Sequence, residues 1–391
     1  MIPYGRHHID ESDVEAVSNL LRNGMLTQGP MVAAFEEAVA SYTGSKYAVA
    51  VSSATAGLHL AAVVAGVGPG QALVTSPITF VASSNAAHYA GGHALFADVE
   101  ASTVNISPHT LKTAIANNAN VQAVVPVHYA GLPCDMAAIS SVARDAGVCI
   151  IEDAAHALGG HYPDGSKIGS NRYSDMTVFS FHPVKAVAAG EGGIVTTNNE
   201  AHYRHLLRLR SHGIGKLDDP FVMSEQAFDQ GKANPWYYEM IELGYHYRIT
   251  DIQCALGLSQ FKKLDKFLAR RRELALAYDA AFCEFKNLAP AQPADGRERS
   301  GHHIYVVRIA FDKIGMSRGD IMRALRDRGI GSQVHYIPVT SQPYYRQLGH
   351  DTAKYPEALR FYQEALSIPL FFDLSNEEQG TVIVALNELV G

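Results

Sequence analysis

The sequence is poor in cysteine, has no excess of basic residues and contains no long apolar run. Its four cysteines are scattered and form no C-x-x-C pair, so a disulfide framework and a cysteine metal cluster are both poor interpretations. Acidic residues outnumber basic residues by 39 to 32, and the resulting formal charge of −7 argues against nucleic-acid binding. No apolar run reaches the length of about 18 residues that a membrane span requires.

The ends and the histidine pairs also exclude some classes. The opening residues MIPYGRHHIDESD lack the charged and apolar regions of a secretion signal, so we expect a soluble, cytoplasmic protein. The pairs His7-His8 and His302-His303 place neighbours on opposite sides of an extended chain, and nothing nearby completes a metal site. With 391 residues, of which 47% are hydrophobic, the chain can form a large core. At roughly 150 residues per domain, we expect about two or three domains.

Seven short apolar runs predict the main sheet. They lie at 47–51, 72–76, 94–99, 122–127, 148–153, 176–181 and 193–197. The first five are separated by stretches long enough for a helix. Strands that are apolar throughout, with helical crossovers between them, predict an α/β fold whose mostly parallel sheet is covered on both faces.

Two capping patterns predict helix starts outside this region. Ser12 and Glu15 form an S-x-x-E capping box for a first helix, and Thr250 and Gln253 form a second. The second helix can continue through residues 270–282. Its basic run at 270–272 is interpreted as a solvated face.

A smaller domain is expected towards the end of the chain. The apolar runs at 304–311 and 332–339, with a helix at 317–329 between them, indicate an α+β unit. Residues 214–243 break the pattern and predict a long loop or insertion, and such loops are often functional. We therefore divide the chain into a large domain, 1–245, and a small domain with a long connecting helix, 246–391.

The densest cluster of chemically useful residues lies between 151 and 193. Asp153 ends a predicted strand, and Lys185 follows the next one. Ligands of open α/β sheets bind beyond the carboxyl ends of the strands. Pyridoxal phosphate needs a lysine for its Schiff base and a carboxylate at its ring nitrogen. Spacing alone does not separate this interpretation from a surface lysine and a helix-capping aspartate.

A phosphate site is expected beside this pair. Residues 52–66 form a loop of small residues that opens a helix after a strand, and a helix N-terminus favours an anion. Thr55 and Ser180 can add hydroxyl groups. Simple N-capping by Ser53 or Thr55 is an equally common explanation. A hydrolase using Asp153 is a further alternative, but the G-x-S-x-G motif is missing.

Nine segments together resemble one family. They are LTQGP (26–30), SSATAGLHLA (52–61), SPITFVAS (76–83), EDAAHALGG (152–160), SFHPVK (180–185), GEGG (190–193), RSHG (210–213), GYHYRITDIQCALGLSQ (244–260) and QVHYIPV (333–339). The chain resembles the DegT/DnrJ/EryC1/StrS aminotransferases, which are fold-type I enzymes acting on nucleotide-linked keto-sugars. The resemblance covers essentially the whole chain and implies a large domain with a mostly parallel seven-stranded sheet that binds the cofactor.

The resemblance also implies a reaction. Three of the segments are similar to one branch, the C4 aminotransferases of pseudaminic acid biosynthesis. Such an enzyme moves an amino group from L-glutamate to C4 of a UDP-linked 4-keto-6-deoxy-N-acetylhexosamine, giving UDP-4-amino-4,6-dideoxy-N-acetyl-β-L-altrosamine. Alternatives are an aminotransferase for another UDP- or dTDP-linked 3- or 4-keto-sugar, and a regulatory relative without catalysis.

The family's cofactor residues are carried over one by one. The resemblance implies pyridoxal 5′-phosphate as cofactor and Lys185 as the catalytic residue that bonds to it. Asp153 matches the partner of the ring nitrogen. His156 matches the residue beside the ring's O3′ and face, and Phe80 matches a group stacked on the ring. Residues matching the phosphate site are Ala54, Thr55 and Ser180.

Other matches concern the substrate and a second subunit. The motif G-Y-N-x-R usually supplies an asparagine to the phosphate of the neighbouring subunit, but this chain has His246 at that position. An imidazole N–H can donate the same bond. The resemblance therefore implies a homodimer with shared active sites. Residues matching the substrate site are Tyr4, Met25, Leu26, Thr27, Ser53, Gln333, Val334, His335 and Tyr336. A second departure is Ala188-Ala189, where the family usually has hydroxyl side chains.

Overall fold

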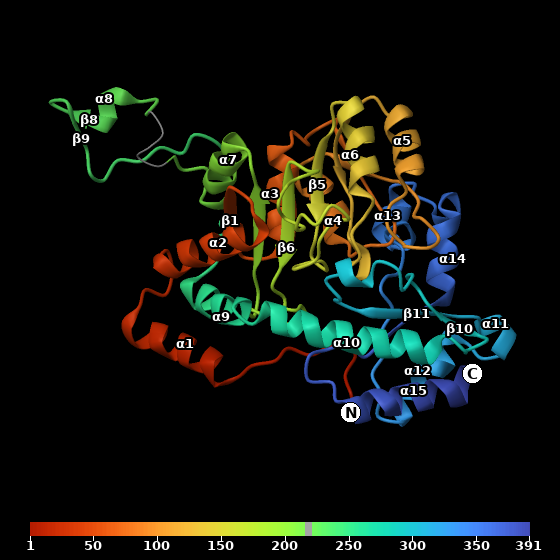
Figure 1. Ribbon diagram of the computed structural model, residues 1–391. Coiled ribbons are helices and arrows are strands. Elements are labelled where there is room, and N and C mark those ends of the chain that lie inside the picture. The colour runs from red at the N-terminus through yellow and green to blue at the C-terminus, as the bar shows by residue number, and fades with distance from the viewer. Residues whose placement is uncertain (216–220) are drawn as a thin grey trace.

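The protein is built around a seven-stranded sheet with helices on both faces, and a smaller unit lies beside it (Figure 1). The computed structural model describes residues 1–215 and 221–391. Strands of the large sheet run in the order β1-β7-β6-β5-β4-β2-β3. Strand β7 is antiparallel to its neighbours, β1 and β6, and the remaining pairs of this sheet are parallel. The predicted α/β fold with a mostly parallel seven-stranded sheet is confirmed.

Each of the seven predicted apolar runs forms a strand. They are β1 (Tyr47–Val51), β2 (Ala72–Thr75), β3 (His93–Phe96), β4 (Val121–Val125), β5 (Cys149–Asp153), β6 (Met176–Ser180) and β7 (Gly193–Thr197). Central strands β2, β6 and β7 are buried along their whole length, which explains why their sequences do not alternate between apolar and polar residues.

Two separate apolar cores hold the helices to the sheet. One core contains residues of α2, α5, α6 and α9 (Asp251–Phe261), and the other contains residues of α3, α4 and α7. The helices of this region are α1 (Glu11–Asn23), α2 (Pro30–Thr43), α3 (Ala54–Val64), α4 (Ala82–Tyr89), α5 (Pro108–Ala116), α6 (Met136–Asp145) and α7 (Glu200–Arg210). This two-sided cover leaves the ends of the strands as the accessible edges of the sheet.

The smaller unit has its own sheet and core. Its antiparallel strands are β10 (Leu288–Pro290), β11 (Tyr305–Ile309) and β12 (Ala365–Ile368). Its helices are α11 (Phe311–Ile314), α12 (Arg318–Asp327), α14 (Pro356–Glu364) and α15 (Asn376–Val390). The short helix α13 (Pro343–Gln347) instead packs on α4 of the large region, where the Tyr345 hydroxyl bonds Ser84 and Asn85. The N-terminus joins the smaller unit, because Ile2 pairs with Ile330. Short 3₁₀ turns occur at Tyr129–Gly131, Arg297–Arg299, Val339–Ser341 and Thr352–Lys354.

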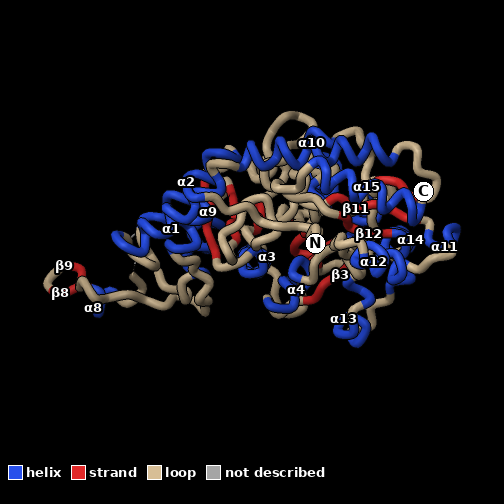
Figure 2. Tube along the Cα trace, turned by 90° about the horizontal axis from the view of Figure 1, so that it is seen from below, coloured by secondary structure: helices blue, strands red, loops and turns tan. Residues whose placement is uncertain are grey.

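Two helices connect the two regions. The predicted long helix is interrupted and forms α9 (Asp251–Phe261) and α10 (Leu264–Phe282). The predicted capping box of Thr250 and Gln253 is confirmed at the start of α9. In the interruption, the Lys263 ammonium reaches α1 and contacts the carboxylates of Asp10 and Asp13 at 2.8 and 2.7 Å. Viewed from below, α10 runs along the edge of the molecule (Figure 2).

Three local expectations from the sequence are wrong. Helix α1 begins at Glu11, and its capping box is made by Asp10 and Asp13, because an aspartate caps a helix as well as a serine does. Arg271 is fully buried and does not lie on a solvated face of α10. Residues 332–339 form no strand beyond a single bridge between Gln333 and Ser367.

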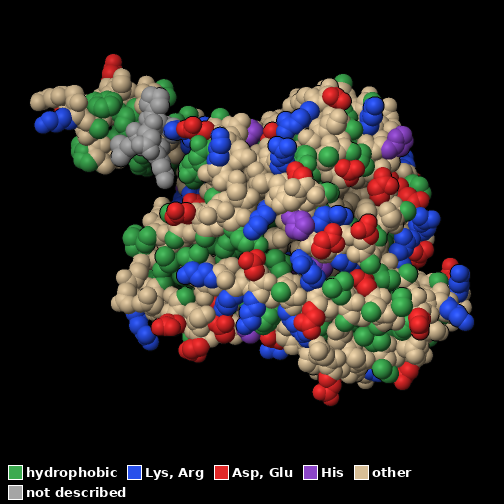
Figure 3. Space-filling model, in the orientation of Figure 1, with side chains coloured by type: hydrophobic (Ala, Val, Ile, Leu, Met, Phe, Trp, Pro, Cys, Tyr) green, Lys and Arg blue, Asp and Glu red, His purple; other side chains and the backbone are tan. Residues whose placement is uncertain are grey.

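The predicted insertion at 214–243 is a projecting segment. Residues 221–241, here called the arm, contain α8 (Ser224–Ala227), β8 (Phe228–Asp229) and β9 (Lys232–Ala233). Figures 1 and 3 show the arm standing away from the body, with hydrophobic side chains on its visible face. Trp236, the sole tryptophan of the sequence, is 74% exposed there. Within the described residues, no helix is long and apolar enough to cross a membrane.

Candidate active site

The ends of three adjacent strands meet at one edge of the large sheet. Asp153 ends β5 and Ser180 ends β6, while Gly193 begins the antiparallel strand β7 and pairs with Ser180. Lys185 follows β6 in a turn, and its backbone N–H donates to the carbonyl of His182. The topology therefore brings the predicted lysine and aspartate to the same edge, as expected for ligand binding at strand ends.

A cavity of about 280 Å³ lies at this edge. Of the residues predicted for the cofactor and substrate, those that line it are Tyr4, Ser53, Ala54, Thr55, Phe80, Asp153, His156, Ser180, Lys185, His335 and Tyr336. They come from segments that lie far apart in the sequence, from Tyr4 to Tyr336. The structure thus brings most of the predicted site together, although their individual roles stay predictions.

Lys185 points into a pocket that disfavours its charged form. Its Nζ lies 3.2 Å from Nε2 of His303. Burial lowers the pKa of Lys185 to about 8; Asp153 opposes this effect and Arg271 adds to it. An amine with such a pKa is partly uncharged near neutral pH, and an uncharged amine is the form that attacks a carbonyl group.

Asp153 is fixed by short hydrogen bonds on the side of α4. The Ser83 hydroxyl donates to its Oδ2 at 2.6 Å, and the Ala155 N–H donates to its Oδ1 at 3.1 Å. The Thr79 hydroxyl lies 2.6 Å from that of Ser83. These contacts restrict the rotation of a buried carboxylate that lines the same cavity as Lys185.

His156 is held between the two regions of the protein. Its Nε2 lies 2.9 Å from the hydroxyl of Tyr336, and its ring centroid lies 4.3 Å from that of His303. Burial, with Lys185 and His335 adding to the effect, holds the pKa of His156 well below its usual range. The ring is therefore neutral, and it can lie against a flat ligand without adding a charge.

The start of α3 forms a small anion cradle. Ser53 caps the helix by accepting from the Ala56 N–H, so the capping explanation of this serine is correct. Ala54 and Thr55 also line the cavity, and the first N–H groups of a helix lack acceptors within the helix. A Cβ at Gly193 would come within 2.5 Å of the backbone at Ser53 and Ala54. Glycine at this position therefore allows the cradle to press against the sheet.

Two predicted substrate residues line a neighbouring hollow instead. Gln333 and Val334 border a hollow of about 260 Å³, which shares Phe80, His335 and Tyr336 with the main cavity. The two spaces are therefore adjacent, and a ligand larger than the cofactor could extend from one into the other.

Four predicted residues lie away from the cavity of their own chain. Met25 and Leu26 are more than half exposed, and Thr27 pairs with Thr250 at the start of α9. His246 is exposed and accepts a hydrogen bond from Arg248 at 3.1 Å. The predicted role of His246 needs a contact with a second subunit, and the roles of all four residues stay predictions.

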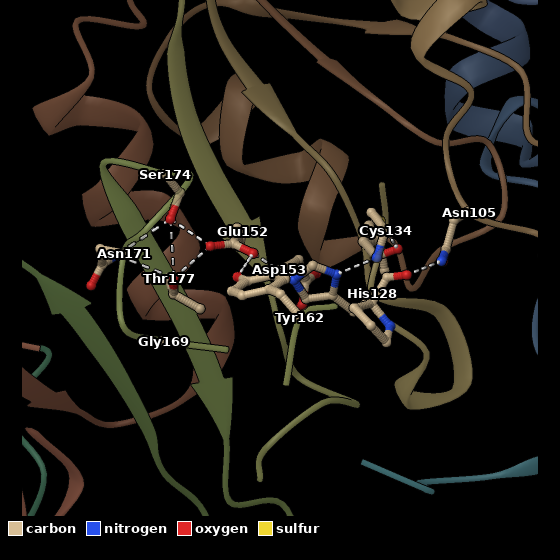
Figure 4. A network of polar contacts seen from close by, with 12 residues as sticks. Asn105, His128, Cys134, Glu152, Asp153, Tyr162, Gly169, Asn171, Ser174 and Thr177 are labelled. Carbon is tan, nitrogen blue, oxygen red and sulfur yellow. Dashed lines mark hydrogen bonds and ion pairs between the residues drawn. The ribbon is translucent and has the colours of Figure 1, made fainter. Parts of the chain in front are cut away.

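Glu152 is a buried carboxylate that precedes Asp153 on β5 (Figure 4). Consecutive residues of a strand point to opposite faces of the sheet. Hydroxyl groups of Tyr162, Ser174 and Thr177 donate to Glu152, and its Oε2 lies 2.7 Å from Nε2 of His128. Burial alone would raise the pKa of Glu152, but the hydrogen bond from His128 and those from the hydroxyls outweigh it and hold the pKa low.

This network was missed from the sequence. The Cys134 N–H donates to Nδ1 of His128, so the ring nitrogen that faces Glu152, Nε2, carries a proton and donates to the carboxylate. Glu152 is thus a buried carboxylate surrounded by hydrogen-bond donors, and it lies next to Asp153 at the end of β5. Glu152 lies in the predicted EDAAHALGG segment, but nothing in the sequence pairs it with His128.

His303 was also missed, because the sequence offers His302-His303 only as an unsupported metal pair. In the structure His303 lines the cavity and contacts Lys185. The sequence signal that could have found His303 is the apolar run that follows it, which forms β11. The backbone N–H of His303 bonds the carbonyl of Ala130, which ties this segment to the large region.

Comparison with known proteins decides between the remaining interpretations. Residues 7–387 match the DegT/DnrJ/EryC1/StrS aminotransferase family. The chain belongs to this family. It is therefore an aminotransferase, and the regulatory and hydrolase alternatives are not supported.

Related proteins and structures match along the whole chain. The spore coat polysaccharide biosynthesis protein SpsC of Bacillus subtilis is 39% identical over 100% of this chain and 97% of that protein. The Helicobacter pylori PseC structure, an aminotransferase of pseudaminic acid biosynthesis, has a TM-score of 0.89 and 29% identity, covering 100% of this chain and 99% of that one.

A second similar structure was determined in a cofactor-bound form. The Streptococcus pneumoniae sugar aminotransferase Spr1654, in its PMP form, has a TM-score of 0.88 and 30% identity, covering 100% of this chain and 99% of that one. Enzymes of this family use pyridoxal 5′-phosphate. The residues at the cavity fit that group, because a lysine amine, a carboxylate and a helix N-terminus lie together around one space. The predicted cofactor is confirmed.

Proposed function

We propose that the protein transfers an amino group from L-glutamate to C4 of a UDP-linked 4-keto-6-deoxy-N-acetylhexosamine. The product would be UDP-4-amino-4,6-dideoxy-N-acetyl-β-L-altrosamine, an intermediate of pseudaminic acid biosynthesis. The observation that carries this proposal is the placement of Lys185 and Asp153 in one cavity at the strand ends. Similarity to PseC over the whole chain supports the choice of sugar.

Lys185 is proposed to bind the cofactor and to move protons. Pyridoxal phosphate, when bound, supplies an aldehyde that condenses with amines and a ring that accepts an electron pair. Asp153 would hold the ring nitrogen, and the N-terminus of α3 would hold the phosphate. The uncharged Nζ of Lys185 can take a proton from a neighbouring carbon and return it to another. Its pKa of about 8 makes both forms available near neutral pH.

The substrate is proposed to enter through the hollow beside the cavity. Tyr336 lines both spaces, and its hydroxyl lies 2.9 Å from Nε2 of His156. Gln333 and Gln342 give the hollow amide groups that can bond a sugar or nucleotide. Binding of the nucleotide there would hold the keto carbon over Lys185 and so lower the entropy cost of the reaction.

The working unit is proposed to be a homodimer. The arm carries a group of large hydrophobic residues that are exposed in the described part of the chain, among which Val222, Trp236, Tyr238 and Met240 are the most exposed. His246 lies just after this arm and outside its own cavity. A second copy would cover the arm and could bring His246 to the partner's phosphate cradle. The cytoplasmic location stays a prediction.

A second candidate is transfer to another keto-sugar at C3 or C4, with UDP or dTDP as carrier. It is favoured by the 39% identity to SpsC, which is named for spore coat polysaccharide biosynthesis. The same lysine and carboxylate would serve both reactions, so we expect the choice between them to depend on how the hollow around Gln333 holds the sugar and its carrier.

The test is turnover of a panel of UDP- and dTDP-linked 3- and 4-keto-sugars with L-glutamate. The rate is measured as release of 2-oxoglutarate. NMR of the product identifies the carbon aminated and its configuration. We expect the UDP-linked 4-keto-6-deoxy-N-acetylhexosamine to be converted fastest, with the 4-amino group in the L-altro configuration. Preference for another sugar by tenfold or more would support the second candidate and contradict the first.

A further inference from the structure

The reactive lysine and a histidine of the smaller unit are in direct contact. Lys185 follows strand β6 of the large sheet, whereas His303 immediately precedes the strand β11 region of the small sheet. Their side-chain nitrogens, Nζ and Nε2, lie 3.2 Å apart. Nothing in the reaction proposed above uses this histidine.

His303 is held in place through its backbone. Its N–H donates to the carbonyl of Ala130, and its carbonyl accepts from Nη1 of Arg271 at 3.1 Å. The same Arg271 nitrogen bonds the carbonyls of His302 and Leu370. A fully buried arginine that donates to three carbonyls fixes the loop that presents the imidazole.

The imidazole is neutral in these surroundings. Burial, with Lys185, His156, Arg271 and His335 adding to the effect, holds the pKa of His303 well below its usual range. Asp153, from the large domain, is the acidic group that acts on the neighbouring Lys185, and it raises the pKa of that lysine against the effect of burial. A neutral imidazole carries one proton, and with that proton on Nδ1 the other nitrogen, Nε2, accepts a hydrogen bond.

Little room for water remains beside the contact between Lys185 and His303. The space between Lys185, His303, His156 and Ser180 measures about 10 Å³, which is at the lower limit for one water molecule. Nδ1 of both His156 and His303 finds no partner among the described residues. The imidazole Nε2 is therefore the main hydrogen-bond partner available to the lysine nitrogen on this side.

We propose that His303 is a positioning residue for Lys185: its Nε2 accepts a hydrogen bond from the ammonium group and holds the nitrogen towards the small domain whenever the lysine is not bonded to the cofactor. The proposal deepens the role of Lys185 given above and rests on it. It also makes the lysine's chemistry depend on the smaller unit, because that unit supplies the acceptor.

The test is competitive labelling of the cofactor-free protein with trace acetic anhydride between pH 6 and pH 11. The acetylated fraction of Lys185 is measured by mass spectrometry against a free-amine standard, which gives the pH midpoint of that amine. Without the acceptor the ammonium form is less stable. We expect His303→Leu to move the midpoint down by about one pH unit, the size expected for loss of a hydrogen bond to a charged group.

Two further variants keep the test decisive if the leucine variant does not fold. The amide of His303→Gln reaches the position of Nε2 and should restore a midpoint close to that of the unaltered protein. The amide of His303→Asn is too short and should behave like leucine. His302→Asn is the matched control, because this neighbour has a φ of 45° that asparagine tolerates, and its ring does not contact Lys185.

The proposal is overturned if the midpoint stays unchanged or rises when the imidazole is removed, or if glutamine and asparagine give the same value. Labelling uses no sugar substrate. Failure of the sugar assay therefore leaves this result intact, and failure here leaves the proposed reaction standing.

Discussion

At the residue scale, burial lowers the pKa of Lys185 and so favours the nucleophilic role proposed for it. An exposed lysine, whose pKa is ordinarily 10.5, is almost fully charged at pH 7. A pKa of about 8 leaves about one tenth of the amine uncharged at that pH, several hundred times more than for an exposed lysine. The pocket therefore supplies a nucleophile without needing a separate base.

The carboxylate of Asp153 should be indispensable for turnover. Asp153→Asn keeps the shape of the side chain but removes the charge that would hold a protonated ring nitrogen. We expect the turnover rate to fall by about 10²-fold or more, as when a single charged contact to the reacting groups is removed. Steady-state kinetics with saturating cofactor measure this effect.

Ser83→Ala provides the matched control for that variant. It removes the 2.6 Å hydrogen bond to Oδ2 of Asp153 but keeps the charge. We expect a loss of about tenfold or less, the size of one hydrogen bond. If the asparagine variant lost no more than the alanine variant, the proposed role of the Asp153 charge would be wrong.

Several site residues could be predicted from the sequence because they follow strands in a recognisable pattern. Asp153 and Lys185 are examples, and the structure places both at one cavity. His303 was not predicted, because its contact with Lys185 joins two segments that lie 118 residues apart in the sequence. Arg271 was wrongly predicted to lie on a solvated face because of its charge. In the structure it is buried, and the carbonyl groups of three residues accept its hydrogen bonds.

At the element scale, the position of α3 depends on the strand beside it. Gly193 begins β7 and lies against the turn at Ser53 and Ala54, where a Cβ would meet backbone atoms at 2.5 Å. Backbone atoms at that distance cannot move aside cheaply. The N-terminus of α3, which is the proposed phosphate site, is therefore positioned by β7 as well as by α3 itself.

Gly193→Ala should weaken cofactor binding. The added methyl group would displace the turn that begins α3 and so disturb its N–H groups. We expect the dissociation constant for pyridoxal phosphate to rise at least about tenfold, as measured by absorbance titration of the cofactor-free protein.

Gly380→Ala is the control, since no described atom lies within 4 Å of a Cβ at this position in α15. Alanine there should leave cofactor affinity unchanged and stabilise the helix by up to about 1 kcal/mol. Unchanged affinity in the Gly193 variant would show that the start of α3 does not bind the phosphate.

The elements that the sequence predicts best are those with one dominant signal. All seven apolar runs form strands, because each run supplies the buried residues of one strand in a sheet that is covered on both faces. The helix after Thr250 was correctly started but not correctly ended, because the break near Lys263 coincides with its ion pairs to α1. Residues 332–339 look like a strand but line the site, where their backbone makes only one bridge.

At the scale of the whole molecule, the two regions close on one cavity. The large sheet supplies Lys185 and Asp153, and the smaller unit supplies His303, His335 and Tyr336. Helix α10 joins the regions and carries Arg271, which bonds loops of the smaller unit. Neither region would form this site alone.

The arm should stabilise a dimer. Replacing Trp236 and Met240 together with glutamate puts charges where a second copy is proposed to pack, and we expect the protein to dissociate to monomers. Analytical ultracentrifugation measures the mass. Val384→Glu is the control, since this exposed residue lies on α15, far along the chain from the arm. A dimer that survives the double substitution unchanged would contradict a role of the arm in assembly.

The central claim is that the Lys185 amine bonds to pyridoxal phosphate in this cavity. The most direct measurement is borohydride reduction of the protein with bound cofactor, followed by digestion and mass spectrometry of the peptides. We expect the reduced cofactor to be attached to Lys185 alone, and the attachment to be lost in Lys185→Ala. Attachment to a different lysine, or a fully active Lys185→Ala variant, would contradict the account.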